Sequence, residues 1–401
     1  MKSNPFKIPA ILLTGMLMLA FSCNTQNSRN KMKLSGAESK ATRNNDRCLF
    51  FVGSGDSGLS HPIKLVELDE DNLAFSIIDS FPDAGGAGYL ALSPDMHFLY
   101  SSSDENLPGY EEQGSVAAFS LDTTGRLHFL NKRNSGGREN CHVHVSPDGR
   151  FVFAANYSSG HATAIEVDEH GMLGDITATM KGEGSGPVSD RQEGPHAHQV
   201  MTDPSGRFLL VPDLGTDKVM IYSFDSSTGK LSPNPTQPFL KMPPGTGPRH
   251  LAFGPGGTAL YILGELSASL TACRFDPEQG RISPLNSASI VAEDFEGKHQ
   301  SAAVRIHPSG QFIYATNRED ISNLAVFKRE EDGSISRIQV LENVAYWPRD
   351  FNVTPDGKYL ILAGGRSNQL ELYAIEPETG MLNDTGASLY LPGPICVIPY
   401  K

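Results

Sequence analysis

One short motif occurs six times along this chain, and it constrains the fold more than any other feature. Each copy has an apolar segment, then Pro followed by Asp, Ser or Gly, and then a second apolar segment. The motif prolines are Pro94, Pro147, Pro204, Pro255, Pro308 and Pro355. Neighbouring prolines are 53, 57, 51, 53 and 47 residues apart. Repeats of this length that contain several short strands are typical of β-propeller blades.

The motif itself predicts a hairpin. Pro presets φ for the turn, and the glycine that follows in most copies can adopt the left-handed conformation beyond it. Further strand patterns follow each hairpin, as in residues 218–224. Because no segment shows sustained helical periodicity, the sequence predicts an all-β fold of four-stranded blades.

The two ends of the chain supply a seventh blade. Residues 394–398 form an innermost-strand pattern with no hairpin after it, and residues 48–52 form a second-strand pattern with no first strand before it. Residues 63–68 and 73–78 provide the third and fourth strands. We therefore predict a seven-bladed β-propeller closed by pairing the C-terminal strand with the N-terminal blade, which removes an open sheet edge.

Four cysteines follow residue 23, and their spacing matches neither a zinc site nor a CxxC redox pair. They are Cys48, Cys141, Cys273 and Cys396. The default interpretation is free thiols buried in strands. Closure of the ring would place Cys48 and Cys396 on adjacent strands, so a disulfide between them is the alternative in an oxidising compartment.

The N-terminus has the pattern of an export signal. Lys2 and Lys7 precede an apolar run at residues 8–21 that is short for a membrane span. The run ends in Ala20-Phe21-Ser22-Cys23, which resembles a bacterial lipobox. We predict a signal peptide at residues 1–23 with lipidation of Cys23, an ordinary cleaved signal peptide being the alternative. Residues 24–46 have the pattern of a flexible tether. Residues 47–401 are predicted to form the propeller.

These features predict an exported bacterial lipoprotein that faces the periplasm or the cell surface. Its membrane contact would come only through the N-terminal lipid anchor, and we expect a monomer. The formal net charge of −13 argues against nucleic-acid binding, which usually requires a basic surface. Any anion site must therefore be a local concentration of basic side chains.

Counting residues from each motif proline also locates the positions at the mouth of the central channel. Six residues before each motif proline the innermost strand begins, and ten residues after it the second strand ends. In an antiparallel hairpin these two positions lie side by side, so both should ring one mouth of the central channel. The position before the proline holds Gly88, Cys141, His198, Arg249, Ala302 and Arg349. The position after it holds Asp104, Tyr157, Leu214, Glu265, Arg318 and Gly365.

Three arginines, a histidine and a carboxylate thus converge on one mouth: Arg249, Arg318, Arg349, His198 and Glu265. Crowding like charges is unfavourable without a counterion, so this set predicts an anion-binding site. The alternative is a set of solvated loop residues around a wet channel. His196 lies two residues before His198, and His142 lies one residue from the ring.

The pairs His142-Val-His144 and His196-Ala-His198 could each chelate a metal, because residues two apart share a strand face. The count from the motif prolines places no carboxylate or cysteine partner in the same blade. We therefore predict no metal site.

Six further motifs stand in order, each in its expected blade. They are Gly194-Pro-His-Ala-His198, Val211-Pro-Asp-Leu-Gly-Thr-Asp217, Gly247-Pro-Arg-His-Leu251, Glu265-Leu, Asn317-Arg318 and Pro348-Arg-Asp-Phe351. Over residues 48–400 the chain resembles the lactonase family of seven-bladed propellers. That family includes propeller-type 6-phosphogluconolactonases and the fungal carboxy-cis,cis-muconate lactonizing enzyme.

The resemblance implies a small anionic lactone as substrate and no metal or other cofactor. The family's site residues, a His, two Arg and a Glu, correspond to His198 or His196, Arg249, Arg318 and Glu265. Glu265 or His198 would act as general base and Arg249 would stabilise the oxyanion.

Arg318 and Arg349 would bind the substrate's phosphate or carboxylate, with His196 and His142 as further substrate-binding residues. The first hypothesis is a lactonase most like 6-phosphogluconolactonase, converting 6-phospho-D-glucono-1,5-lactone to 6-phosphogluconate. The alternatives are a carboxymuconate cycloisomerase and a non-enzymatic exported binding module. The phosphorylated substrate belongs to cytosolic carbohydrate metabolism, whereas the leader predicts export.

Overall fold

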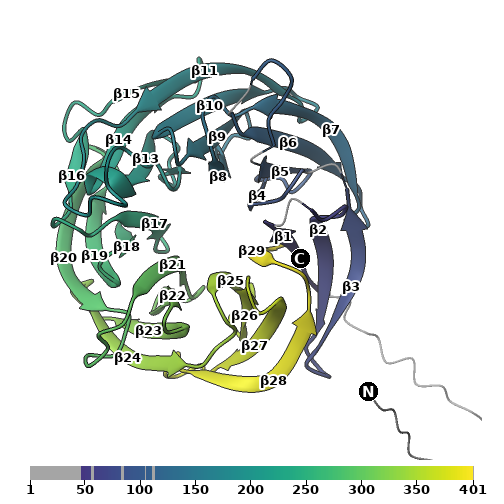
Figure 1. Ribbon diagram of the computed structural model, residues 1–401, viewed down its shortest axis with the longest axis vertical. Helices are drawn as coiled ribbons and strands as arrows, with labels where there is room; N and C mark the ends of the chain where they lie inside the picture. The colour runs from purple at the N-terminus through teal and green to yellow at the C-terminus, as the bar shows by residue number, and fades with distance from the viewer. Residues whose placement is uncertain (1–46, 56–57, 83–84, 104, 111–112, 401) are drawn as a thin grey trace, which may run out of the picture. The chain divides into compact units, whose positions relative to one another are not determined.

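Seven antiparallel sheets form a ring around a central axis in the computed structural model (Figure 1). The structure describes residues 47–400 except residues 56–57, 83–84, 104 and 111–112. The all-β, seven-bladed propeller predicted from the repeat is confirmed. The predicted signal peptide, Cys23 and the predicted tether lie outside the described residues.

Six blades take their strands consecutively from the chain, innermost strand first. The first three of these are β4 (Tyr89–Leu92), β5 (Phe98–Ser103), β6 (Ser115–Leu121) and β7 (Leu127–Asn134); β8 (Asn140–Val145), β9 (Phe151–Asn156), β10 (His161–Val167) and β11 (Leu173–Lys181); and β12 (Met201–Thr202), β13 (Phe208–Asp213), β14 (Lys218–Asp225) and β15 (Lys230–Pro233), with β16 (Phe239–Lys241) also paired to β14. The other three are β17 (Pro248–Phe253), β18 (Ala259–Gly264), β19 (Ser269–Asp276) and β20 (Arg281–Ser289); β21 (His299–Ile306), β22 (Phe312–Glu319), β23 (Asn323–Arg329) and β24 (Ile335–Glu342); and β25 (Pro348–Val353), β26 (Tyr359–Gly364), β27 (Gln369–Ile375) and β28 (Leu382–Tyr390).

The seventh blade combines both ends of the chain. Its strands, in order from the axis, are β29 (Pro394–Pro399), β1 (Cys48–Ser54), β2 (Ile63–Asp69) and β3 (Ala74–Phe81). In Figure 1 the yellow C-terminal strand lies inside the purple N-terminal strands. The predicted closure is therefore confirmed.

The register of this closing pair rules out the proposed disulfide. Cys396 pairs with Gly53, whereas Cys48 pairs with Leu68 on the other side of β1. Five residues of strand separate Gly53 from Cys48, which is about 17 Å at the usual rise per residue. A disulfide needs Cα atoms less than about 7 Å apart. The predicted alternative was therefore wrong, and none of the four described cysteines forms a disulfide.

The repeated hairpins have the predicted turn geometry. At Ser146 the backbone N–H donates to Phe151 O at 2.8 Å, and the Gly149 N–H donates to Ser146 O at 2.9 Å. Gly149 has φ of 73°, the left-handed conformation expected after Pro-Asp. The hydroxyl of Ser146 donates to Asp148 Oδ1 at 2.6 Å, which further stabilises the turn.

Apolar side chains fill the space between neighbouring blades. Phe151 and Phe153 of β9 pack edge-on against Phe224 of β14 in the next blade, with ring centroids 5.3 and 4.9 Å apart. Comparable clusters join other neighbouring pairs of blades. Because the core lies between blades, the strand ends facing the axis are left for polar groups.

β-Bulges re-aim three innermost strands where they begin. The register shifts between Asn140 and His142, between Pro248 and His250, and between Pro348 and Asp350. The residue skipped in the last two cases is an arginine of the predicted ring, Arg249 or Arg349. A bulge bends its strand and redirects a side chain, so these arginines do not follow the regular alternation.

The only helical element in the described part of the chain is the 3-10 turn η1 (Leu214–Thr216). None of the described residues forms a helix long and apolar enough to cross a membrane.

Candidate active site

A single buried carboxylate contacts three guanidinium groups at one mouth of the channel. Glu265 follows β18 and is 1% exposed. Its Oε1 accepts a hydrogen bond from Arg191 at 2.6 Å. Its Oε2 lies 2.8 Å from Arg249 Nε and 3.2 Å from Arg318 Nη2. The arginines come from the loop after β11, the start of β17 and the end of β22, so the cluster joins three blades.

The arginines control the charge state of Glu265. Burial alone would raise the pKa of its carboxyl, but Arg318, Arg249 and Arg191 together lower that pKa to about 2. A carboxylate this acidic is a weak proton acceptor near neutral pH. Burial lowers the pKa of Arg249 to about 10, so this guanidinium stays cationic at neutral pH.

His198 is a better candidate than Glu265 for a general base. Its Nε2 lies 3.9 Å from Glu265 Oε2, and the residue is 5% exposed. Burial, reinforced by the charges of Arg249, Arg349 and Arg318, lowers the pKa of the imidazole well below its usual 6.5. His198 is therefore neutral at neutral pH. Its Nδ1 has no hydrogen-bond partner among the described residues.

His196 packs against Tyr157 rather than against Glu265. The two rings stack with centroids 4.5 Å apart and planes at 14°, and His196 Nδ1 lies 3.1 Å from Tyr157 O. The other ring nitrogen lies 3.1 Å from Glu193 Oε1. Tyr157 in turn packs edge-on against His198 and accepts a hydrogen bond from Arg191 at 3.3 Å. His196 thus positions the residue that contacts both His198 and Arg191.

Arg349 does not contact Glu265 but shares an indole with Arg318. The guanidinium carbons of Arg318, Arg349 and Arg366 lie 4.7, 5.2 and 4.6 Å from the ring centroid of Trp347. Among the described residues, no carboxylate lies within ion-pair distance of Arg349 or Arg366.

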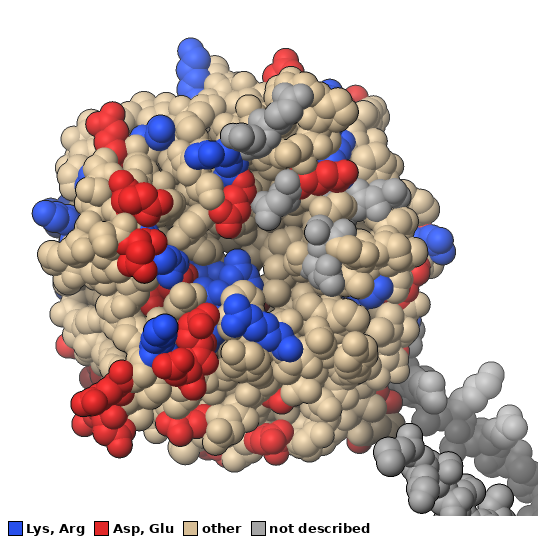
Figure 2. Space-filling view, viewed as in Figure 1, with Lys and Arg blue, Asp and Glu red and all other residues tan. Residues whose placement is uncertain are grey.

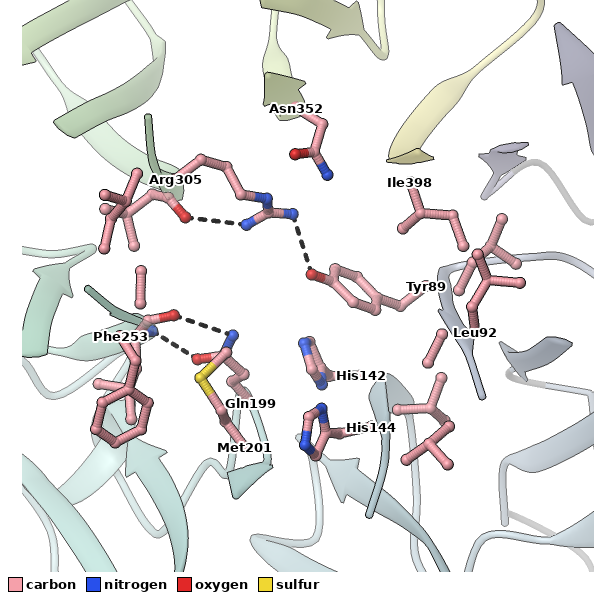
Figure 3. Close-up of a pocket in the computed structure, with 18 residues that line it drawn as sticks. Tyr89, Leu92, His142, His144, Gln199, Met201, Phe253, Arg305, Asn352 and Ile398 are labelled. Atoms are coloured by element: carbon pink, nitrogen blue, oxygen red, sulfur yellow. Dashed lines mark hydrogen bonds between the residues drawn. The ribbon is translucent and has the colours of Figure 1, made fainter. Parts of the chain in front are cut away.

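His142 lies farther along β8, in the channel. It lines a cavity of about 400 Å³ with Tyr89, against which its ring packs at a centroid distance of 3.9 Å (Figure 3). Neither of its ring nitrogens has a hydrogen-bond partner in the part of the chain that the structure describes. The structure therefore does not bring His142, predicted to bind substrate, to Glu265.

The mouth carries excess positive charge. Arg191, Arg249 and Arg318 all pair with Glu265, and the charge of Arg349 acts on Arg249 beside them. Figure 2 shows basic side chains collected in the hollow at the centre of the ring, although the chain as a whole has a net charge of −13. An arrangement of this kind attracts a small anion.

Sequence reasoning missed Arg191, Trp347 and Arg366. Arg191 lies in a long loop between β11 and β12, where the hairpin repeat gives no position. Trp347 and Arg366 lie two residues before Arg349 and one residue after Gly365. Their nearness to the predicted ring was the available signal. No group of three or more His, Cys, Asp or Glu among the described residues is arranged to hold a metal ion.

Comparison with known proteins adds to this geometry. Residues 49–399 match the profile of the family described as "Lactonase, 7-bladed beta-propeller". A 6-phosphogluconolactonase of Bacillus subtilis is 32% identical over 349 residues, covering 86% of this chain and 97% of the relative. A 6-phosphogluconolactonase of Formosa agariphila is 28% identical over a stretch that covers 86% of this chain and 97% of the relative. The solved structure of the periplasmic gluconolactonase of Pseudomonas aeruginosa superposes with a TM-score of 0.81 at 26% identity. The superposition covers 88% of this chain and 99% of that one.

Proposed function

Because the chain belongs to the lactonase family of seven-bladed β-propellers, we propose that it hydrolyses the ring ester of an anionic sugar-acid lactone. The relatives named 6-phosphogluconolactonase make 6-phospho-D-glucono-1,5-lactone the first candidate substrate. The observation that carries the proposal is the buried Glu265–arginine cluster beside a neutral histidine.

The chemistry begins with His198. Its neutral imidazole takes a proton from a water molecule as the oxygen of that water attacks the lactone carbonyl carbon. Negative charge develops on the carbonyl oxygen, where Arg249 donates to it in a site shielded from solvent. The tetrahedral intermediate then collapses, the ring C–O bond breaks, and the departing alkoxide takes the proton from His198. The product is an open-chain hydroxy acid, which ionises.

Glu265 holds the arginines rather than moving a proton. With a pKa of about 2 it stays ionised through the cycle. Its two oxygens hold Arg191, Arg249 and Arg318 in place before substrate arrives. Such preorganisation avoids reorganisation of the donors as charge develops.

A lactone panel tests the proposal. The purified protein is assayed with 6-phosphogluconolactone, glucono-1,5-lactone and a carboxymuconate, each corrected for its spontaneous reaction. We expect hydrolysis of an aldonolactone well above background. Turnover of the muconate alone would identify a cycloisomerase instead, and no turnover of any compound would contradict an enzymatic role.

We further propose that the enzyme lies outside the cytoplasm and is anchored to the membrane through a lipid on Cys23. The lipobox-like pattern at residues 20–23 and the periplasmic relative from P. aeruginosa support export. Substituting Cys23 by Ala should move the protein from the membrane fraction to the soluble fraction of the cell. Retention of the variant in the membrane fraction would contradict lipid anchoring.

A further inference from the structure

Arg249 is held by one anion and two neutral acceptors. Its Nε lies 2.8 Å from Glu265 Oε2. Its Nη1 donates to the carbonyl oxygen of Ala302 and, at 3.1 Å, to Nε2 of His250. Among the described residues, none accepts a hydrogen bond from Nη2. Because a guanidinium group is planar, contacts at Nε and Nη1 fix its orientation and leave Nη2 to a ligand.

The imidazole of His250 lies between Arg249 and the proposed base. The residue is 4% exposed, and its ring packs edge-on against the rings of His198, His142 and Tyr89 at centroid distances of 5.6, 5.8 and 6.1 Å. Consecutive strand residues normally point to opposite faces of a sheet. The bulge at Arg249 interrupts this alternation, so that the side chains of Arg249 and His250 meet.

The contact with Arg249 determines the tautomer of His250. A guanidinium group has donors and no acceptor, so Nε2 of the imidazole must carry a lone pair rather than a proton. A neutral ring then carries its proton on Nδ1, which has no hydrogen-bond partner among the described residues. Burial, reinforced by the charge of Arg249, lowers the pKa of His250 well below its usual 6.5. The ring is therefore neutral at neutral pH, as the contact requires.

A neutral acceptor suits an arginine that stabilises an oxyanion. A carboxylate in the place of His250 would compete with the negative charge that develops on the substrate. The imidazole and the Ala302 carbonyl orient Arg249 without adding a counterion. The one anion that Arg249 contacts, Glu265, is shared with two other arginines. Arg249 thus keeps charge that can act on the transition state.

We propose that His250 is a positioning residue of the lactonase site, and that it holds Nη1 of Arg249 so that Nη2 donates to the lactone carbonyl oxygen as negative charge develops there. Donors that are oriented before the reaction need no reorganisation during it. The catalytic part of this inference rests on the proposed function. The contact between His250 and Arg249 can be tested without turnover.

The first experiment determines the tautomer of His250 by nuclear magnetic resonance. The purified full-length protein is labelled with isotopes in its 12 histidines, and the signals missing from His250→Gln are assigned to His250. We expect a neutral ring with its proton on Nδ1 at neutral pH. A proton on Nε2, or a cationic ring at neutral pH, would overturn the proposal.

The second experiment compares kcat in two amide variants that differ by one methylene group. The side-chain oxygen of His250→Gln can take the place of Nε2, whereas that of His250→Asn is too short to reach Arg249. We expect kcat to fall about 10- to 100-fold in His250→Asn, the loss of one hydrogen bond to a charged group. It should stay within a few fold of wild type in His250→Gln. KM should change little in either variant, because the contact acts on charge that develops in the transition state.

His144→Asn is the matched control. His144 also faces the channel, as Figure 3 shows, but its Nε2 lies 2.9 Å from the hydroxyl of Thr202. The same substitution there removes a channel histidine without removing an acceptor from Arg249. We expect its kcat to equal that of the wild type, and circular dichroism checks that each variant folds.

The outcomes separate the two proposals. If no lactone is hydrolysed but His250 carries its proton on Nδ1, the proposed function fails and the contact with Arg249 stands. If a lactone is hydrolysed and His250→Asn keeps the wild-type kcat, or His250→Gln is as slow as His250→Asn, the positioning role fails. Should His250→Asn not fold, the tautomer in the wild type and the kcat of His250→Gln decide between these results.

Discussion

Two buried carboxylates face the channel, and they differ in how their charge is matched. In the channel, Asp350 Oδ1 accepts from Arg305 at 2.6 Å, and Asp350 Oδ2 accepts from Val397 N at 3.0 Å. Arg305 also donates to the Tyr89 hydroxyl at 3.1 Å, as Figure 3 shows, and to Val304 O at 3.0 Å. One cation therefore meets one anion, and protein groups complete their hydrogen bonds.

At the mouth, one carboxylate meets three arginines, with more cations close by. The Arg305–Asp350 pair connects β21 to β25 and, through Tyr89 and Val397, to β4 and β29, which suits a structural contact across the ring. We propose that the balance of charges, rather than the presence of a buried ion pair, distinguishes the candidate ligand site from this structural contact.

The largest effect is expected from His198→Gln. Losing the proton acceptor should lower kcat about 10²- to 10⁴-fold, the usual contribution of general acid–base catalysis. Steady-state kinetics measures this, with circular dichroism as a check that the fold persists. A variant within a few fold of the wild-type kcat would assign the base to another group.

Glu265→Gln tests the unbalanced cluster. Three guanidinium groups lose their counterion, so unfolding free energy should fall by about 3–5 kcal/mol. Added phosphate or sulfate should restore part of it by binding the arginines. Thermal melts with and without the anion measure both effects, and no anion-dependent gain over wild type would contradict an anion-attracting mouth.

Acid unfolding gives a second measure of the same residue. Because the folded pKa of Glu265 is about 2, below the unfolded value of about 4.3, its stabilisation is full above the unfolded pKa. It is lost as pH falls through the folded pKa. The Glu265→Gln protein should lack this acid-dependent component.

Asp350→Asn provides the contrasting case. Removing one partner of this buried pair should also cost about 3–5 kcal/mol of stability. Here added phosphate should restore nothing beyond its effect on wild type, and folded protein should keep its kcat. Equal rescue of the two variants would remove the distinction between the mouth and the channel.

The smallest effect concerns the pH dependence of kcat/KM. The lowered pKa of His198 keeps it neutral as pH falls through 6.5, so activity should decline only at a more acidic pH. Arg349→Gln removes one of the charges that lower this pKa, so the acid limb should move to higher pH by less than about one unit. Arg281→Gln is the control, because Arg281 begins β20 at the end of its blade opposite Glu265. It should leave the limb in place, and an unmoved limb in Arg349→Gln would argue against His198 as the base.

Sequence reasoning located much of the candidate site because the repeat sets a distance from each turn to the channel. The positions counted from the motif prolines included His198, Arg249, Glu265 and Arg318, which the structure brings together. The same count placed Arg349 at the mouth, where it packs on Trp347. It could not reach Arg191, which arrives from a loop outside the repeat.

The number of blades, their hairpins and the closing strand follow from local patterns, because turn residues and strand alternation act over a few neighbouring positions. The register of β1 against β29, the bulges at Arg249 and Arg349, and the sharing of Glu265 among three arginines depend on contacts between distant segments. Those contacts exist only once the ring has closed, and their electrostatics depend on burial that no local pattern records. Tertiary structure therefore decided that Glu265 pairs with three arginines and that the Nδ1 of His198 has no partner among the described residues, the arrangement on which the proposed proton transfer rests.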